Sequence, residues 1–233
     1  TRYIGDWSSD VCSSDLKGTV TAIGNPRDEW RAVLAAERLA APDTRPARLT
    51  LFGEELAAFR NSEGVLGIID GLCPHNGSLL AWGVAEEGGL TCAYHGWAFG
   101  PDGTCLWVPG ASSFSQYNLK AYPLVEHAGL LWTHLGAGER PTTPVVPWAP
   151  LPAEQRAATQ WQVLADSADA ALAAEVSAAG WPVQADGSYA GPGGLVLYLQ
   201  VTEGFQKQQH CCALLWHPTR ALSAAERAAM ATR

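Results

Sequence analysis

Two short stretches decide the fold of this chain: CPHNGS, which begins at Cys73, and CAYHGW, which begins at Cys92. The first stretch forms a Cys-x-His pair with His75, and the second forms a Cys-x2-His pair with His95. Sixteen residues separate His75 from Cys92, so we expect the two pairs to lie on two neighbouring loops. Thiolate sulfur and imidazole nitrogen at this spacing indicate a metal site.

Four such donors suit two kinds of site. Two thiolates and two imidazoles hold either a tetrahedral zinc ion or a [2Fe-2S] cluster, in which the cysteines bind one iron and the histidines bind the other. Zinc sites favour like ligands on one knuckle, whereas cysteine and histidine alternate here, which gives each iron one ligand from each stretch. The alternation favours the cluster, and a structural zinc site is the alternative.

The same stretches resemble the two cluster loops in the alpha subunits of Rieske-type non-haem iron ring-hydroxylating oxygenases. Residues 122–126, YPLVE, and the pair Leu131-Trp132 resemble the closing strands of that domain, so the resemblance runs from about Trp30 to Gly136. It implies one [2Fe-2S] cluster per chain, with imidazole N–H groups near the surface as the electron exit toward a partner iron. The ligands that it implies are Cys73, His75, Cys92 and His95.

The neighbours of the ligands indicate the low-potential kind of Rieske protein. In the high-potential kind each loop carries one more cysteine and the two form a disulfide, but here Ser78 and Tyr94 occupy those positions. In that kind a serine hydroxyl and a tyrosine hydroxyl also donate hydrogen bonds to sulfur, and this chain has Trp97 and Phe99 at those positions. Fewer hydrogen bonds to sulfur predict a potential toward the low end of the Rieske range of about −150 to +300 mV. We expect Trp97 to shield the cluster from water.

The resemblance further implies a mononuclear Fe(II) site, made of two histidines and one carboxylate. Family members usually carry an Asp-x2-His-x4-His run after the Rieske domain, but here Asp166 is followed by Asp169 and Ala174 at the ligand positions. The other histidines are not expected to replace them. His127 and His134 have no cysteine or carboxylate at ligand spacing beside them, and His210 and His217 lie seven residues apart, on opposite faces of one strand. An iron site of this kind is not found on the chain, and no catalytic residue is assigned.

We expect a mainly β fold, with a Rieske-type antiparallel β-sandwich domain followed by a partial α+β region. Turn residues separate five expected strands, at residues 31–34, 49–52, 56–59, 65–69 and 130–134. Farther along, residues 154–180 are Ala-rich with helical spacing and residues 181–217 have strand character. Ser223 and Glu226 form a capping box that opens a last helix.

The expected organisation has five parts. Residues 1–16 fit no helix or strand period and resemble a translated sequencing adapter, and the last helix reaches Arg233 without a stop signal, so we expect both natural ends to lie outside this sequence. The parts are the adapter-like residues 1–16, a lead-in at 17–29, the Rieske domain at 30–137, a Pro-rich linker at 138–153 and, at 154–233, a region that resembles an oxygenase catalytic domain without its iron triad.

Composition excludes two classes of partner. The chain has 15 Lys and Arg against 23 Asp and Glu, a net charge of −8, which removes the attraction that a nucleic-acid binder needs. No apolar run approaches the roughly 18 residues of a membrane span. Cys105, Cys211 and Cys212 show no disulfide framework and are expected to be buried core thiols, which agrees with a reducing, cytoplasmic location.

The function expected is one-electron transfer through the cluster, within the terminal component of an aromatic-ring-hydroxylating or demethylating oxygenase. Its partners would be a reductase or ferredoxin as electron donor, and further chains in a homo- or hetero-oligomer. One alternative is a cluster-bearing subunit without its own oxygen-activating iron. Another is a stand-alone Rieske ferredoxin, which would not need the 80 residues at 154–233. The sequence assigns no substrate.

Overall fold

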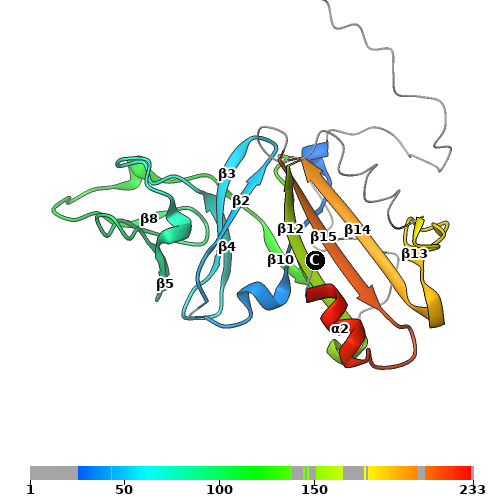
Figure 1. Cartoon of the computed structure of the whole chain (residues 1–233). Helices are drawn as coiled ribbons and strands as arrows, with labels where there is room; N and C mark the ends of the chain where they lie inside the picture. Colours follow the sequence, from blue (N-terminus) through cyan, green and yellow to red (C-terminus); the bar gives the residue numbers. More distant parts are fainter. Residues whose placement is uncertain are drawn as a thin grey trace, which may run out of the picture.

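The computed structural model consists mainly of antiparallel β-sheets, arranged in three regions along the molecule (Figure 1). It describes residues 26–42, 44–137, 144, 146, 151–164, 176, 178–203 and 208–231. In Figure 1, β5 and β8 lie at one end, β2 to β4 in the middle, and β12, β14 and β15 at the other end. No helix in these ranges is long and apolar enough to span a membrane.

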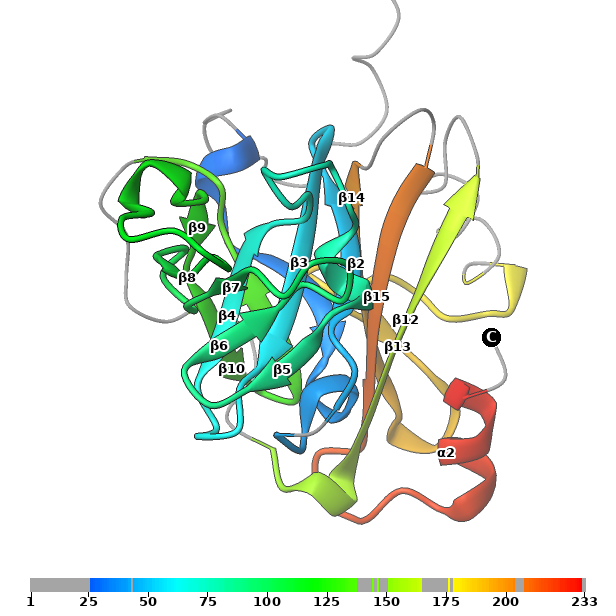
Figure 2. The same ribbon diagram turned by 90° about the vertical axis from the view of Figure 1, so that its left-hand side faces the viewer.

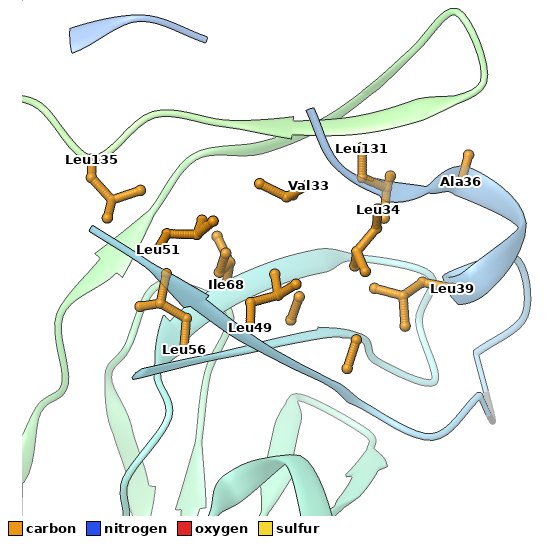
Figure 3. Close-up of a cluster of buried hydrophobic side chains, with 12 residues drawn as sticks. Val33, Leu34, Ala36, Leu39, Leu49, Leu51, Leu56, Ile68, Leu131 and Leu135 are labelled. Carbon is orange, nitrogen blue, oxygen red and sulfur yellow. The ribbon is translucent and has the colours of Figure 1, made fainter. Parts of the chain in front are cut away.

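The middle region is a sandwich of two small sheets. One sheet has the strand order β2 (Ala47–Leu51), β3 (Glu54–Arg60), β4 (Leu66–Asp70) and β9 (Ala121–Tyr122). The other has the order β1 (Arg31–Ala35), β11 (Leu130–Thr133) and β10 (Leu124–His127). Leucine, isoleucine and valine side chains from the two sheets and the segments beside them fill the space between the sheets (Figure 3), and nine of them are fully or nearly fully buried. This apolar layer makes the region a rigid base for the loops beyond it.

A third sheet carries the two predicted metal-binding stretches. Its strands run in the order β5 (Val84–Glu86), β6 (Gly89–Thr91), β7 (Ala98–Phe99) and β8 (Cys105–Trp107). Figure 2 looks onto this sheet and shows β5, β6 and β7 in front of the middle region. Its inner face shares one core with β3 and β4, in which Phe59, Ile69, Leu90 and Phe99 are completely buried. The strands that bear the loops are therefore fixed to the base by apolar packing.

The C-terminal sheet packs against the other side of the base. Its strands run in the order β12 (Arg156–Leu164), β15 (Gln208–Trp216), β14 (Val196–Glu203) and β13 (Tyr189–Ala190), and helix α2 (Ala224–Ala231) lies against β12. Leu130 and Trp132 share a buried cluster with Leu214 and Trp216. The Gln200 side chain adds a polar tie, because its Oε1 accepts a 2.7 Å hydrogen bond from the backbone N–H of Ala32.

Short 3₁₀ helices join these strands. They are η1 (Pro26–Asp28), η2 (Ala36–Leu39), η3 (Leu80–Trp82), η4 (Ser115–Tyr117), η5 (Ala153–Gln155) and η6 (Pro192–Gly194).

Most of the expected elements are confirmed. The five expected strands correspond to β1, β2, β3, β4 and β11, and the strands expected at 181–217 correspond to β13, β14 and β15. The capping box is also confirmed, since the Ser223 N–H donates to Glu226 Oε2 at 2.7 Å and the Glu226 N–H donates to Ser223 Oγ at 3.2 Å. The mainly β class is therefore correct.

The helix predicted over 154–180 is wrong for its first part. Residues 156–164 form β12, which pairs with β15 along its whole length, from Arg156 opposite Trp216 to Leu164 opposite Gln208. Pairing with a long neighbouring strand outweighs the weak helical preference of a few alanines. The adapter-like residues 1–16, most of the linker and the positions of Asp166, Asp169 and Ala174 lie outside the described residues.

Candidate metal centre

The first loop, between β4 and η3, holds Cys73 in a tight turn. The Cys73 N–H donates to the Ser78 carbonyl and the Gly77 N–H donates to the Cys73 carbonyl, both at 2.8 Å. Gly77 has a φ of 68°, a left-handed conformation that costs an L-residue free energy because of its Cβ. The glycine therefore lets the chain fold back on the cysteine.

The second loop, between β6 and β7, repeats the first. The Cys92 N–H donates to the Trp97 carbonyl at 2.8 Å, and the Gly96 N–H donates to the Cys92 carbonyl at 3.0 Å. Gly96 has a φ of 73°. Each loop thus places its cysteine, its glycine and the residue five positions after the cysteine in the same backbone pattern, so the two loops present their donors in the same way.

The two thiols lie buried beside each other beneath the loops. Cys73 and Cys92 are 3% and 2% exposed, and neither forms a disulfide. Burial, followed by the neighbouring Cys92 thiol, raises the pKa of Cys73 to about 11, although the backbone N–H groups of His75 and Asn76 point at the sulfur and act in the other direction. The N–H groups aimed at the sulfur favour the thiolate form. Two buried thiolates side by side would repel each other, so this site needs a bound cation.

The two imidazoles lie beside each other at the surface. The ring centroids of His75 and His95 are 4.5 Å apart with an interplanar angle of 66°, and both residues are exposed. Trp97, which is buried, stacks flat on His75 at 5.0 Å and 5°. The Tyr94 ring lies 3.9 Å from that of His95. Aromatic contacts therefore fix the orientation of both imidazoles.

The structure thus places the four predicted ligands in two pairs across the two loops, cysteine with cysteine and histidine with histidine. An inner pair of sulfur donors and an outer pair of nitrogen donors is the arrangement that a cluster with two unlike irons requires. Within the described ranges, no group of three His, Cys, Asp or Glu side chains is placed to hold a single metal ion.

Trp97 and Phe99, two neighbours of the ligands considered in the sequence, both lie close to the metal centre. Trp97 covers one imidazole, and Phe99 is completely buried in the core below the loops. Tyr117 was not predicted from the sequence, and its ring lies 4.8 Å from that of Trp97. It sits in η4, twenty residues farther along the chain, and no spacing signal connects the two.

The remaining candidates have ordinary structural surroundings. His134 makes an edge-on contact with Trp30 at a centroid distance of 4.7 Å, and His127 lies in β10. The His217 ring is 3.1 Å from the Gly193 carbonyl. His210 belongs to β15, but its side chain is outside the described part. The three remaining cysteines of the described chain are buried thiols, as predicted: Cys105, Cys211 and Cys212.

Comparison with protein families identifies the loop-bearing part. Residues 29–123 match the model of the Rieske [2Fe-2S] domain. This part of the chain is a Rieske domain. The Rieske domain includes both loops and all four predicted ligands, and it extends from just before β1 to β9.

The curated relatives that match this part of the chain include several oxygenase subunits. The chain is 39% identical over 117 residues to the 3-chlorobenzoate-3,4-dioxygenase oxygenase subunit of Comamonas testosteroni, covering 48% of this chain and 27% of the relative. It is 37% identical over 129 residues to the phthalate 4,5-dioxygenase oxygenase subunit of Pseudomonas putida, covering 53% and 29%. It is 34% identical over 131 residues to the 5,5'-dehydrodivanillate O-demethylase oxygenase subunit of a Sphingobium strain, covering 53% and 30%. The chain therefore matches less than a third of the length of these relatives.

Solved structures agree on the fold over a longer part of the chain. Dicamba monooxygenase bound to dicamba has a TM-score of 0.64 at 18% identity, covering 81% of this chain and 77% of that structure. The reduced complex between oxygenase and ferredoxin in carbazole 1,9a-dioxygenase has a TM-score of 0.57 at 16% identity, covering 87% and 74%. The likeness therefore extends beyond the Rieske domain into the C-terminal sheet.

Proposed function

We propose that this chain transfers single electrons through a [2Fe-2S] cluster, as part of the terminal component of an aromatic-ring-hydroxylating or demethylating oxygenase. In this proposal Cys73 and Cys92 hold one iron through sulfur, and His75 and His95 hold the other through one ring nitrogen each. The observation that carries it is the pairing of like donors across two loops of the same backbone pattern.

When bound, the cluster supplies one-electron redox chemistry. The residues of the chain set the conditions for it. The N–H groups of His75 and Asn76 aimed at Cys73 stabilise negative charge on that sulfur. Trp97 and Phe99 stand where a high-potential Rieske protein has hydroxyl groups, and both are buried and offer no O–H. A dry site with few donors disfavours added negative charge, which supports a potential at the low end of the Rieske range.

The surface position of the histidines supports their role as the electron exit. Both imidazoles are exposed whereas both thiols are buried, so the outer N–H of each ring can reach a partner without any opening of the fold. We assign the electron donor to a reductase or a ferredoxin, and the acceptor to an oxygen-activating iron in the same oligomer. The ferredoxin complex of a protein with this fold supports the choice of donor.

The C-terminal sheet supports an oxygenase component in preference to a stand-alone ferredoxin. It shares a buried cluster with β1 and β11 and ties them through Gln200, so it is an integral part of the folded unit. We propose that residues 30–137 form the electron-transfer domain and that residues 154–233 belong to an oxygenase catalytic domain. The ligands of the mononuclear iron are not assigned on this chain.

Metal and sulfide analysis tests the proposal. The full chain, reconstituted anaerobically with iron and sulfide, should contain two acid-labile sulfides and two irons per chain, and dithionite should produce an EPR signal with a low average g-value. A third iron would restore a complete oxygenase site, and two would support a cluster-bearing subunit. Zinc in the native protein, with no sulfide, would contradict the proposal.

A further inference from the structure

The outer face of sheet β5–β8 carries exposed apolar side chains and lies at the foot of the second loop. Val84 lies opposite Thr91, and Thr91 lies opposite Ala98. Ala98 in turn lies opposite Trp107. Directly opposed residues share a face of a sheet, so these four form one row across all four strands, spanning about 14 Å at the usual strand spacing of about 4.8 Å.

The neighbouring row shows which face is turned outward. Ala85 and Leu90 are opposed, as are Leu90 and Phe99, and Phe99 and Cys105. All four are at most 8% exposed and belong to the core shared with the base. Since successive residues of β5, β6 and β7 alternate between faces, the row that begins at Val84 faces solvent there. In β8 the register shifts between the two rows, and the exposed fractions decide: Trp107 is 52% exposed, whereas Cys105 is 3% exposed.

The second loop rises from the middle of the solvent-facing row. Thr91 ends β6 and Ala98 begins β7, so the six loop residues between them leave and re-enter the sheet at that row. Val84 and Trp107 flank the loop and are 57% and 52% exposed. Tyr94, which contacts His95, is 64% exposed. Of the eight large apolar side chains exposed in the described chain, six fall between residues 72 and 107. Apolar exposure is thus concentrated around the metal centre.

The charge on this part of the chain has one sign. Residues 71–119 contain no lysine or arginine and three acids, which are Glu86, Glu87 and Asp102. Glu86 is on the outer face, because it alternates with buried Ala85 and its carboxylate accepts a 2.6 Å hydrogen bond from the Thr91 hydroxyl. A partner with acidic side chains around its redox centre would be repelled here.

We infer that Val84, Tyr94, Glu86 and Trp107, together called the outer patch, form the docking surface for the redox protein that exchanges electrons with this chain. The partner presents an apolar contact surface bordered by lysine or arginine side chains. Apolar contact with Val84 and Trp107 supplies the affinity, and Glu86 supplies the attraction and the register. This inference rests on the proposed function and adds to it the chemistry of the partner.

Electron transfer to two probe proteins tests the outer patch. The reconstituted chain is reduced with dithionite, the excess reductant is removed, and the protein is mixed in a stopped-flow instrument with ferricytochrome c, whose haem edge is ringed by lysines. One electron leaves the chain and converts ferric haem to ferrous haem, and no covalent bond forms or breaks. Cytochrome b5, whose haem edge is ringed by acids, is the opposite probe.

Two matched variants separate the outer patch from the net charge of the chain. Val84→Lys places a cation on the patch, and Val183→Lys adds the same charge at a valine that is 65% exposed in the C-terminal region. At low ionic strength Val84→Lys should slow the reduction of cytochrome c by about tenfold, and Val183→Lys by less than about twofold. Val84→Ser, which adds no charge, should give a smaller loss than Val84→Lys.

Equal slowing by the two lysine variants would overturn the inference, and so would faster reduction of cytochrome b5 than of cytochrome c by the unmodified chain. The integrated EPR signal of each reduced variant keeps this outcome distinct from failure of the proposed function. Equal signals with unequal rates support the outer patch. A chain that gives no cluster signal in any variant overturns the proposed function, and the inference with it.

Discussion

Replacing Gly77 by alanine should loosen the metal centre without disturbing the rest of the fold. Gly77 has a φ of 68°, and a Cβ placed on it would meet nothing within 4 Å. The only free-energy cost of Gly77→Ala is therefore that of the left-handed backbone conformation. The hydrogen bond from the Gly77 N–H to the Cys73 carbonyl holds the backbone in this conformation, so the cost falls on the first loop.

The chain offers a closely matched control in Gly64. Its φ is 85°, a Cβ there would also meet nothing within 4 Å, and its N–H donates to the Asn61 carbonyl at 2.9 Å, compared with 2.8 Å for Gly77. Gly64 lies in the turn between β3 and β4, away from the loops. An L-residue in this conformation costs about 1–2 kcal/mol, so both variants should lose about that much free energy of unfolding.

The two variants should differ in how they hold iron. A loss of about 1–2 kcal/mol confined to the first loop makes its open form about five to thirty times more populated. Iron release to a ferrous chelator should accelerate by that factor in Gly77→Ala and stay unchanged in Gly64→Ala, while urea unfolding of the metal-free proteins gives similar losses. Equal release rates in the two variants would refute the assignment of Cys73 as a ligand held by this turn.

Three further predictions concern other described residues. Cys73→Ser should abolish cluster uptake, whereas Cys105→Ser, at a thiol equally buried in the same core, should retain two irons per chain in metal analysis. Trp97→Phe reduces the ring stacked on the first-loop imidazole and admits water, so voltammetry should show a higher potential than in the unmodified chain, and an unchanged or lower value would contradict its shielding role. The Arg220 guanidinium lowers the pKa of Glu226 from 4.5 to about 2, so the stabilisation is present above pH 4.5 and is lost as the pH falls toward 2. Glu226→Gln should therefore be less stable than the unmodified chain at pH 6 and equally stable near pH 2 in thermal unfolding, and a difference that persists at pH 2 would be evidence against this ion pair.

The metal centre was the part most accessible from sequence. Two ligands within each loop are fixed by covalent spacing, and a glycine four residues after each cysteine supplies the turn, so Cys73 with His75 and Cys92 with His95 stand out without any knowledge of the fold. Each of the five expected strands near them is short and bounded by turn residues, which is a local signal. These features depend on nearest neighbours along the chain, and pattern reasoning reads them well.

The parts that sequence analysis missed depend on contacts between distant residues. Strand β12 contains the alanines Ala157 and Ala158, which favour a helix when taken alone, yet both are opposed to leucines of β15 more than fifty residues away. The contact of Tyr117 with Trp97 joins two elements through side chains only. Neither pattern has a period in the sequence, so only the assembled fold determines them.

In the proposed centre, two histidines bind one iron of a binuclear cluster while two cysteines bind the other. Pulsed EPR on the dithionite-reduced protein distinguishes these ligands, because the ¹⁴N nuclei of imidazole couple to the electron spin, whereas the common sulfur isotope has no nuclear spin. We expect strong couplings from two ¹⁴N nuclei, one from His75 and one from His95. A reduced cluster that shows no nitrogen coupling, or a centre that is silent because it contains zinc, would contradict it.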